Sequence, residues 1–108
     1  MEKINAEHYS YRVTWSEEDG EFVAQCAEFN SLSHLAAKSA DALRGITELV
    51  RGVVDDMQSV GETPPLPFSQ RPYSGKFMLR LPPETHRRLS IEAAEQNVSL
   101  NRLVAAKL

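Results

Sequence analysis

Apolar and polar residues alternate along the first part of the chain, and this two-residue period is typical of a half-buried strand. The alternating apolar residues are Tyr9, Tyr11, Val13 and Trp15. An acidic run ending in Gly20 follows, and because glycine readily takes a positive φ, this run predicts a hairpin loop. Residues 21–27 are therefore expected to return as a second strand, and residues 31–35 are the candidate for a third.

The hydrophobic period changes beyond Ser39. Apolar residues are then spaced by alternately three and four positions, at Leu43, Ile46, Val50, Val53 and Met57. This spacing predicts an amphipathic helix with Ser39 as its N-cap and Gly61 as its stop. Gly45 and Gly52 are either weak positions that the helix tolerates, at about 1 kcal/mol each, or places of close backbone approach. The predicted order of the first domain, residues 1–61, is β-β-β-α.

Residues 62–75 contain four of the six prolines of the chain. Prolines this dense cannot continue a helix, and they favour an extended, semi-rigid course. We therefore interpret residues 62–75 as a linker between two small domains. Leu66 and Phe68 are apolar enough for part of this linker to add a short strand to the first domain.

A second alternating pattern occupies residues 76–81, at the start of the last domain, residues 76–108. One face of the predicted strand consists of Phe77, Leu79 and Leu81. The opposite face consists of Lys76, Met78 and Arg80. A lone strand leaves its backbone N–H and C=O groups unpaired, so we expect it to pair with the same strand of a second copy. The sequence therefore predicts a dimer whose core is the apolar face.

Two helices are predicted after this strand. Pro83 suits the first position of a helix, and Glu84 is favourable near a helix N-terminus. Asn97 tolerates the left-handed conformation that ends a helix, and Ser99 is a good N-cap for the next one. The expected fold class is therefore α+β, with a small β-β-β-α domain followed by one strand and two helices.

Charge is distributed unevenly along the 108 residues. Residues 1–74 carry six Lys or Arg against twelve Asp or Glu, whereas residues 75–108 carry six against three. An acidic domain is therefore joined to a basic one. A basic domain suits nucleic acid, and an acidic domain suits either simple solubility or a basic protein partner.

The sequence offers little for catalysis. The histidines are scattered at His8, His34 and His86, and the single cysteine, Cys26, is expected to fill a small core position. Acidic residues at 17–21 cluster in the predicted hairpin, where carboxylates are usually solvent-facing turn formers. We therefore expect no enzyme activity, no metal site and no cofactor. The single cysteine and the lack of a signal-peptide core or a long apolar run predict a cytoplasmic protein without a membrane segment.

The last domain contains two short motifs. Leu79-Arg80-Leu81-Pro82 lies at the end of the predicted strand, and Val98-Ser99-Leu100-Asn101 lies in the turn between the two predicted helices and at the start of the second. Both resemble motifs of the ribbon-helix-helix family of bacterial regulators. The resemblance implies that paired strands enter the major groove of DNA, with base contacts from Lys76, Met78 and Arg80. It also implies phosphate contacts by Ser99 and Asn101, at a helix N-terminus whose free N–H groups favour an anion. The alternative is a small amphipathic unit that only caps the first domain.

Five segments of the first domain and the linker follow one another in a recognisable order. They are the strand at 9–15, the acidic hairpin at 17–20, Glu28-Phe29-Asn30-Ser31-Leu32, Asp41-Ala42-Leu43-Arg44-Gly45-Ile46 and Gly61-Glu62-Thr63-Pro64. In this order they resemble the N-terminal domain of HicB-type antitoxins. The resemblance implies a reduced ribonuclease-H-like fold that binds and blocks a small basic RNA-cleaving toxin of the HicA type. It also implies a C-terminal domain that represses the operon.

These patterns together predict a type II antitoxin that acts as a homodimer, or as a higher oligomer on DNA. Its expected partners are double-stranded operator DNA and a HicA-type toxin. The alternative is a stand-alone ribbon-helix-helix regulator whose first domain senses a ligand or oligomerises. A neighbouring gene for a small basic toxin would favour the antitoxin.

Overall fold

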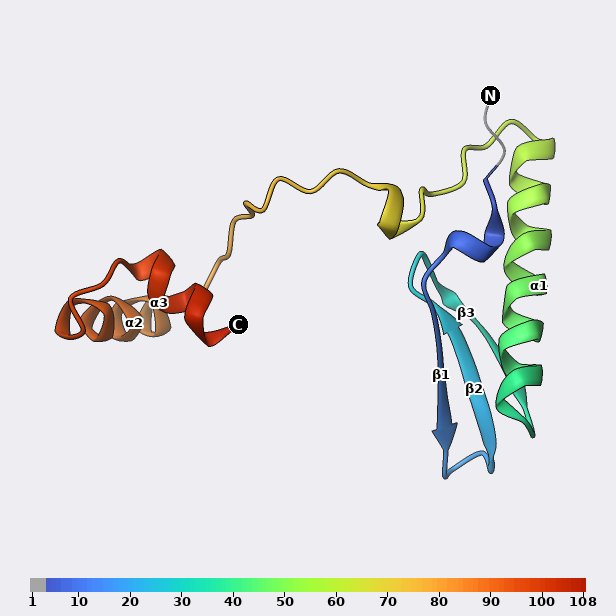
Figure 1. Cartoon of the computed structure of the whole chain (residues 1–108), viewed down its shortest axis with the longest axis horizontal. Coiled ribbons are helices and arrows are strands. Elements are labelled where there is room, and N and C mark those ends of the chain that lie inside the picture. Colours follow the sequence, from blue (N-terminus) through green and yellow to red (C-terminus); the bar gives the residue numbers. More distant parts are fainter. Residues whose placement is uncertain (1–3) are drawn as a thin grey trace. The chain divides into compact units, whose positions relative to one another are not determined.

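The computed structural model describes residues 4–108 and divides into two compact units (Figure 1). The first unit runs through Pro72, and the second is Tyr73–Leu108. The first unit contains a sheet and a long helix, whereas the second contains two shorter helices. The fold is therefore α+β, as the sequence predicts.

The sheet of the first unit has three antiparallel strands in the order β1-β2-β3. They are β1 (Tyr11–Ser16), β2 (Glu21–Cys26) and β3 (Phe29–Ala36). All three predicted strands are present. Strand β1 begins after Tyr9 because a 3-10 turn, η1 (Ala6–His8), precedes it, and β3 is longer at both ends than expected. Gly20 has a φ of 64° in the loop after β1, as its place in the hairpin requires.

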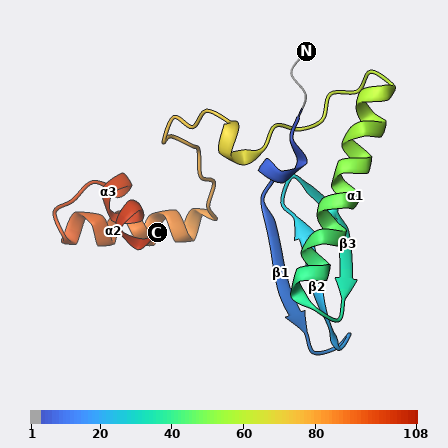
Figure 2. The same ribbon diagram turned by 45° about the vertical axis from the view of Figure 1, so that its right-hand side comes forward.

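One helix, α1 (Ser39–Ser59), covers one face of this sheet (Figure 2). Its buried residues are spaced four apart: Ala42, Ile46, Val50 and Val54. The predicted stripe is therefore wrong at Leu43, which is 43% exposed. The reason is that side chains four residues apart form a ridge along a helix, and the ridge that begins at Ala42 packs on the sheet.

The two ends of α1 differ in how well the sequence predicts them. Ser39 is the first helical residue, and Lys38 occupies the N-cap position without a side-chain hydrogen bond. The predicted Ser39 cap is therefore wrong, because the extended backbone conformation of a cap falls one residue earlier. Gly61 follows the helix with a φ of 81°, as predicted for its stop.

Cys26 lies in the core between the sheet and α1, and 1% of its surface is exposed. Ala24, two residues earlier on the same face of β2, is fully buried. Burial raises the pKa of the Cys26 thiol, so the thiol stays neutral and packs as a small apolar group. The prediction that Cys26 fills a core position is confirmed.

The two glycines inside α1 have different surroundings. A Cβ atom built on Gly45 would overlap the imidazole ring of His34, which comes from β3. A Cβ atom built on Gly52 would meet open space. Gly45 therefore allows close packing of a side chain against the helix backbone, whereas Gly52 is a weak position that the helix tolerates.

Residues 62–71, which we call the strap, pack against the first unit with Pro64 and Pro67 buried. The extra strand predicted around Leu66 and Phe68 is absent. Residues 62–67 have no regular secondary structure, and Phe68–Gln70 form a 3-10 turn, η2. Because prolines lack the N–H that a strand ladder needs, this segment cannot extend the sheet.

Glu28 holds the strap to the sheet. Its carboxylate accepts hydrogen bonds from the backbone N–H of Phe68 and from that of Ser10, each at 2.9 Å. The Tyr9 hydroxyl adds a second attachment by donating to the carbonyl of Pro65 at 2.7 Å. The strap is therefore part of the first unit rather than a free connection.

The carboxyl of Glu28 ionises more readily than an ordinary glutamate. Burial opposes its ionisation, but the hydrogen bonds from the Phe68 and Ser10 backbone amides outweigh burial and lower the pKa of Glu28 from 4.5. A carboxyl group whose pKa is lower in the folded protein than in the unfolded chain stabilises the fold. Its full contribution is present at pH values above the pKa of the unfolded chain. This contribution is lost as the pH falls through the lower pKa of the folded state.

The second unit contains α2 (Pro83–Glu95) and α3 (Leu100–Lys107), which pack against each other. Pro83 is the first residue of α2, and Asn97 has a φ of 57° in the turn. Ser99 caps α3 by accepting a hydrogen bond from the N–H of Arg102 at 3.1 Å. All three predicted boundaries are confirmed.

We expect Gly45→Ala to raise the free energy of unfolding by less than the gain of about 1 kcal/mol that alanine brings to a helix interior, because the added methyl group must displace the exposed His34 ring from the helix backbone. Gly52→Ala is the matched control, and it should raise the free energy of unfolding by up to about 1 kcal/mol. Urea unfolding followed by circular dichroism measures both, and equal stabilisation by Gly45→Ala and Gly52→Ala would contradict the packing of His34 against Gly45.

We expect Glu28→Ala to release the strap and to lower the free energy of unfolding by about 1–2 kcal/mol, because two amide donors lose their acceptor. Chymotrypsin should then cleave faster after Phe68, whose backbone N–H is held by the Glu28 carboxylate at 2.9 Å in the folded protein. The stability difference from the wild type should shrink as the pH falls below 4.5. Glu48→Ala, at an exposed position of α1, should change neither quantity. Equal cleavage rates after Phe68 would refute the role of Glu28.

Candidate functional site

An open groove of about 590 Å³ lies in the second unit. Apolar side chains from two segments line it: Phe77, Leu79 and Leu81 before α2, and Leu100, Val104 and Leu108 in or just after α3. The predicted apolar face of residues 76–81 and the apolar side of α3 therefore meet in one groove.

The apolar residues before α2 are unusually exposed for their size. Phe77 is 76% exposed, Leu79 is 53% exposed and Leu81 is 37% exposed. Among all residues of the second unit, each of which the structure describes, Ala93 and Leu103 alone are buried hydrophobic residues. A single copy therefore leaves its largest apolar side chains in water, at a cost of roughly 25 cal/mol for each Å².

Residues 76–81 have no regular secondary structure in this single chain. The predicted strand is not formed because strand pairing needs a neighbour, and the described sheet contains β1, β2 and β3 only. Pairing with a second copy stays a prediction.

The residues predicted to contact bases are all exposed. Lys76 lines the groove beside Phe77, whereas Met78 and Arg80 do not line it. Met78 is 82% exposed, so both large apolar and basic side chains project from this segment into solvent. The placement of Met78 and Arg80 outside the groove agrees with the alternation expected of a strand, whereas Lys76 departs from it by lining the groove.

The two predicted phosphate contacts have different places at the start of α3. The Ser99 hydroxyl oxygen accepts the Arg102 N–H as the helix cap. Asn101 is exposed and also lines the groove, next to Leu100. Ser99 therefore has a structural role whatever else it contacts, and Asn101 lies where the groove meets the helix N-terminus.

The basic residues of the second unit divide into paired and unpaired ones. Arg87 forms an ion pair with Glu84 at 2.7 Å, and Lys107 forms one with Glu92 at 3.3 Å. The others form no ion pair within residues 4–108: Lys76, Arg80, Arg88 and Arg102. Sequence reasoning missed Arg88 and Arg102 as candidate contacts. The excess of basic residues in this domain was the available signal.

Between residues 4 and 108, no three His, Cys, Asp or Glu side chains lie close enough to hold a metal ion. Among the helices described above, none combines the length and hydropathy that crossing a bilayer requires.

The last part of the chain matches a known protein family. Residues 61–108 match the model of the HicB family, which supports a HicB-type protein and suggests a role related to toxin-antitoxin systems. The match starts just after α1 and contains the strap and the whole second unit. No curated protein and no solved structure matches the chain.

Proposed function

We propose that this chain is the antitoxin of a type II toxin-antitoxin system. In this proposal the second unit binds operator DNA as a dimer and represses the operon, and the first unit neutralises a small basic RNA-cleaving toxin. The observation that carries the proposal is the exposed apolar groove of the second unit, inside a segment that matches the HicB family.

Dimerisation follows from the apolar surface that one copy leaves exposed. If residues 76–81 of two copies pair as antiparallel strands, Phe77, Leu79 and Leu81 are covered by their counterparts and by α3. The same pairing satisfies the backbone groups that lack partners in the single chain. A two-fold arrangement makes the interface self-complementary, so no second kind of surface is needed.

DNA binding follows from the residues on the other side of the paired strands. Lys76 and Arg80 can donate hydrogen bonds to base edges, and Met78 can contact a thymine methyl group. Asn101 and the unpaired Arg102, at the start of α3, are suited to phosphate. The charge of the domain favours this partner, since residues 75–108 carry six basic and three acidic residues.

Toxin neutralisation rests on charge and on the resemblance of residues 9–68 to HicB-type antitoxins. The twelve acidic and six basic residues of segment 1–74 give it a net charge of −6. Such a unit attracts a basic RNA-binding surface and can cover it without any chemistry of its own.

A stand-alone transcriptional regulator is the second candidate. One observation favours it, because the HicB match covers residues 61–108 and leaves the sheet and α1 unmatched. In that case the first unit would sense a ligand or oligomerise instead of binding a toxin.

Co-expression of the full chain with the product of an adjacent gene for a small basic protein tests the two candidates. For an antitoxin, the wild-type chain should restore growth. Arg80→Ala should restore it equally, because toxin and DNA bind to different units. Failure of the wild-type chain to protect cells from the basic protein would favour the stand-alone regulator.

We expect the wild-type chain to sediment as a dimer at micromolar concentration and Leu79→Asp to sediment as a monomer. A charged side chain in a paired apolar face would be buried without a partner. Val60→Asp is the matched control, since Val60 is 69% exposed in the first unit, and it should remain a dimer. A monomeric wild-type protein would contradict the proposed pairing.

We expect Arg80→Ala to weaken binding to the promoter of its own operon by about tenfold and to reduce the ratio of specific to nonspecific affinity. Arg102→Ala should weaken binding to all sequences alike, because a phosphate contact carries no sequence information. Arg87→Ala, which removes a side chain already paired with Glu84, should have the smallest effect. Fluorescence anisotropy at fixed salt measures these affinities, and an unchanged ratio for Arg80→Ala would contradict the base contact.

A further inference from the structure

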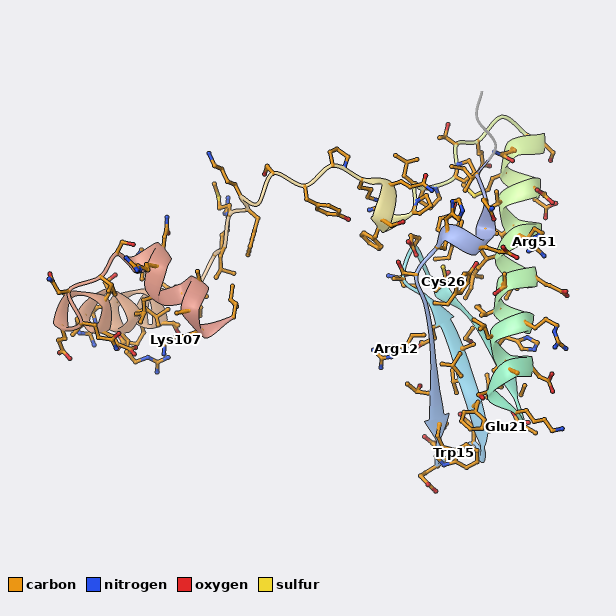
Figure 3. All side chains as sticks on the ribbon, in the orientation of Figure 1. Arg12, Trp15, Glu21, Cys26, Arg51 and Lys107 are labelled. Carbon is orange, nitrogen blue, oxygen red and sulfur yellow. The ribbon has the colours of Figure 1, made fainter. Side chains whose placement is uncertain are left out.

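Trp15 is the single tryptophan of the chain, and 48% of its surface is exposed. It lies near the hairpin end of β1, at the same end of the sheet as Glu21 (Figure 3). Tryptophan is a common anchor of protein interfaces, because it offers a large contact area with few rotatable bonds. An exposed tryptophan on a small acidic unit therefore calls for a physical explanation.

The Trp15 side chain is exposed but held in place. Its ring packs against Phe22 in an edge-to-face arrangement, with centroids 5.1 Å apart and planes at 70°. Its indole N–H donates to the carboxylate of Glu17 at 2.8 Å. The polar atom of the indole already has a partner, so the rest of the ring can be covered by an apolar or cationic group without loss of a hydrogen bond.

The sheet and helix explain why Trp15 is left uncovered. Trp15 lies opposite Phe22, which lies opposite Ala36, so the third strand contributes only a methyl group to this row. The buried positions of α1 begin at Ala42, and the helix covers the sheet from there onward. Phe22 is partly buried and packs against the core as well as against Trp15, so Trp15 is the member of this row that remains uncovered.

The charges around this surface decide what can cover it. The hairpin carries four carboxylates: Glu17, Glu18, Asp19 and Glu21. None of them forms an ion pair within residues 4–108. The nearest cation along β3 and its continuation is Lys38, two residues beyond Ala36. Nucleic acid and acidic proteins would be repelled, whereas a basic surface would gain favourable Coulomb energy.

We propose that Trp15 and Phe22 form a docking surface for a basic protein, in which an arginine side chain of the partner lies against the indole of Trp15. The guanidinium is then within reach of the hairpin carboxylates, so a cation–π contact and charge-assisted hydrogen bonds act on one group. Arginine suits this surface better than lysine, because its planar group stacks on an aromatic ring. The inference rests on the proposed function for its choice of partner, the basic toxin.

A labelled arginine octapeptide and a lysine octapeptide of equal charge are the probes for the full-length chain. We expect the arginine peptide to bind more tightly to the wild type. Trp15→Ala should weaken arginine-peptide binding by about two- to fivefold and bring the two peptides close to equal affinity. Trp15→Phe should restore part of the preference. Anisotropy measures the affinities, and circular dichroism checks that each variant is folded.

Two pairs of substitutions separate this surface from general attraction by charge. Glu18→Gln with Glu21→Gln removes two hairpin charges, and Asp55→Asn with Asp56→Asn removes two charges from α1. The hairpin pair should weaken arginine-peptide binding more than the helix pair. Equal weakening by both pairs, or an unchanged peptide preference in Trp15→Ala, would overturn the proposal.

Growth protection distinguishes a failure of this surface from a failure of the proposed function. If the wild type protects cells from the basic protein and Trp15→Ala protects and binds it equally well, the docking surface is refuted while the antitoxin proposal stands. If the wild type does not protect but the arginine preference depends on Trp15, the antitoxin proposal fails and the surface for a basic partner stands.

Discussion

Small size limits how much apolar surface each unit of this chain can bury. A domain of a few dozen residues has too little interior to remove most of its large side chains from water. The first unit deals with this limit inside one chain, where one helix covers one face of the sheet and the strap covers further surface. The second unit has only two short helices, so Phe77, Leu79 and Leu81 remain exposed until a second copy covers them. The same shortage of core that leaves the second unit incomplete is thus the driving force for its assembly.

The strap changes the boundary between the two units. Its prolines suggest a semi-rigid linker, but their lack of N–H groups is also what prevents them from joining the sheet as a strand. They pack through their rings instead, with Pro67 among the most buried residues of the chain. Glu28 then supplies an acceptor for the amide of Phe68. A proline-rich segment is therefore compatible with a fixed position when its rings are buried and a side chain elsewhere holds one of its backbone groups.

Much of the fold is predictable from local patterns, and the errors have physical causes. Alternation located β1, and the hairpin signal at Gly20 placed β2 after it. Gly61, Asn97 and Ser99 located helix ends because each residue type suits a particular backbone conformation. The side of α1 that faces the sheet was less predictable. Both Leu43 and Ala42 fit an amphipathic stripe, and only packing against the sheet decides between them. The close contact of His34 with Gly45 and the attachment of the strap to Glu28 depend on residues distant in sequence, which no local pattern reveals. In the candidate site, alternation identified the apolar side of residues 76–81, but the share of the groove contributed by α3 required the packed structure.

The strap also sets how closely two first units would be held in a dimer. Four residues, 72–75, lie between the end of the strap and the segment proposed to pair, and an extended chain spans at most about 3.6 Å per residue step. The five steps from residue 71 to residue 76 therefore keep the end of the strap within roughly 18 Å of the pairing segment. Tethers this short create a high effective concentration of one first unit near the other. A partner with two binding faces would gain avidity from such an arrangement, and the second binding event would be nearly independent of the concentration of the partner in solution.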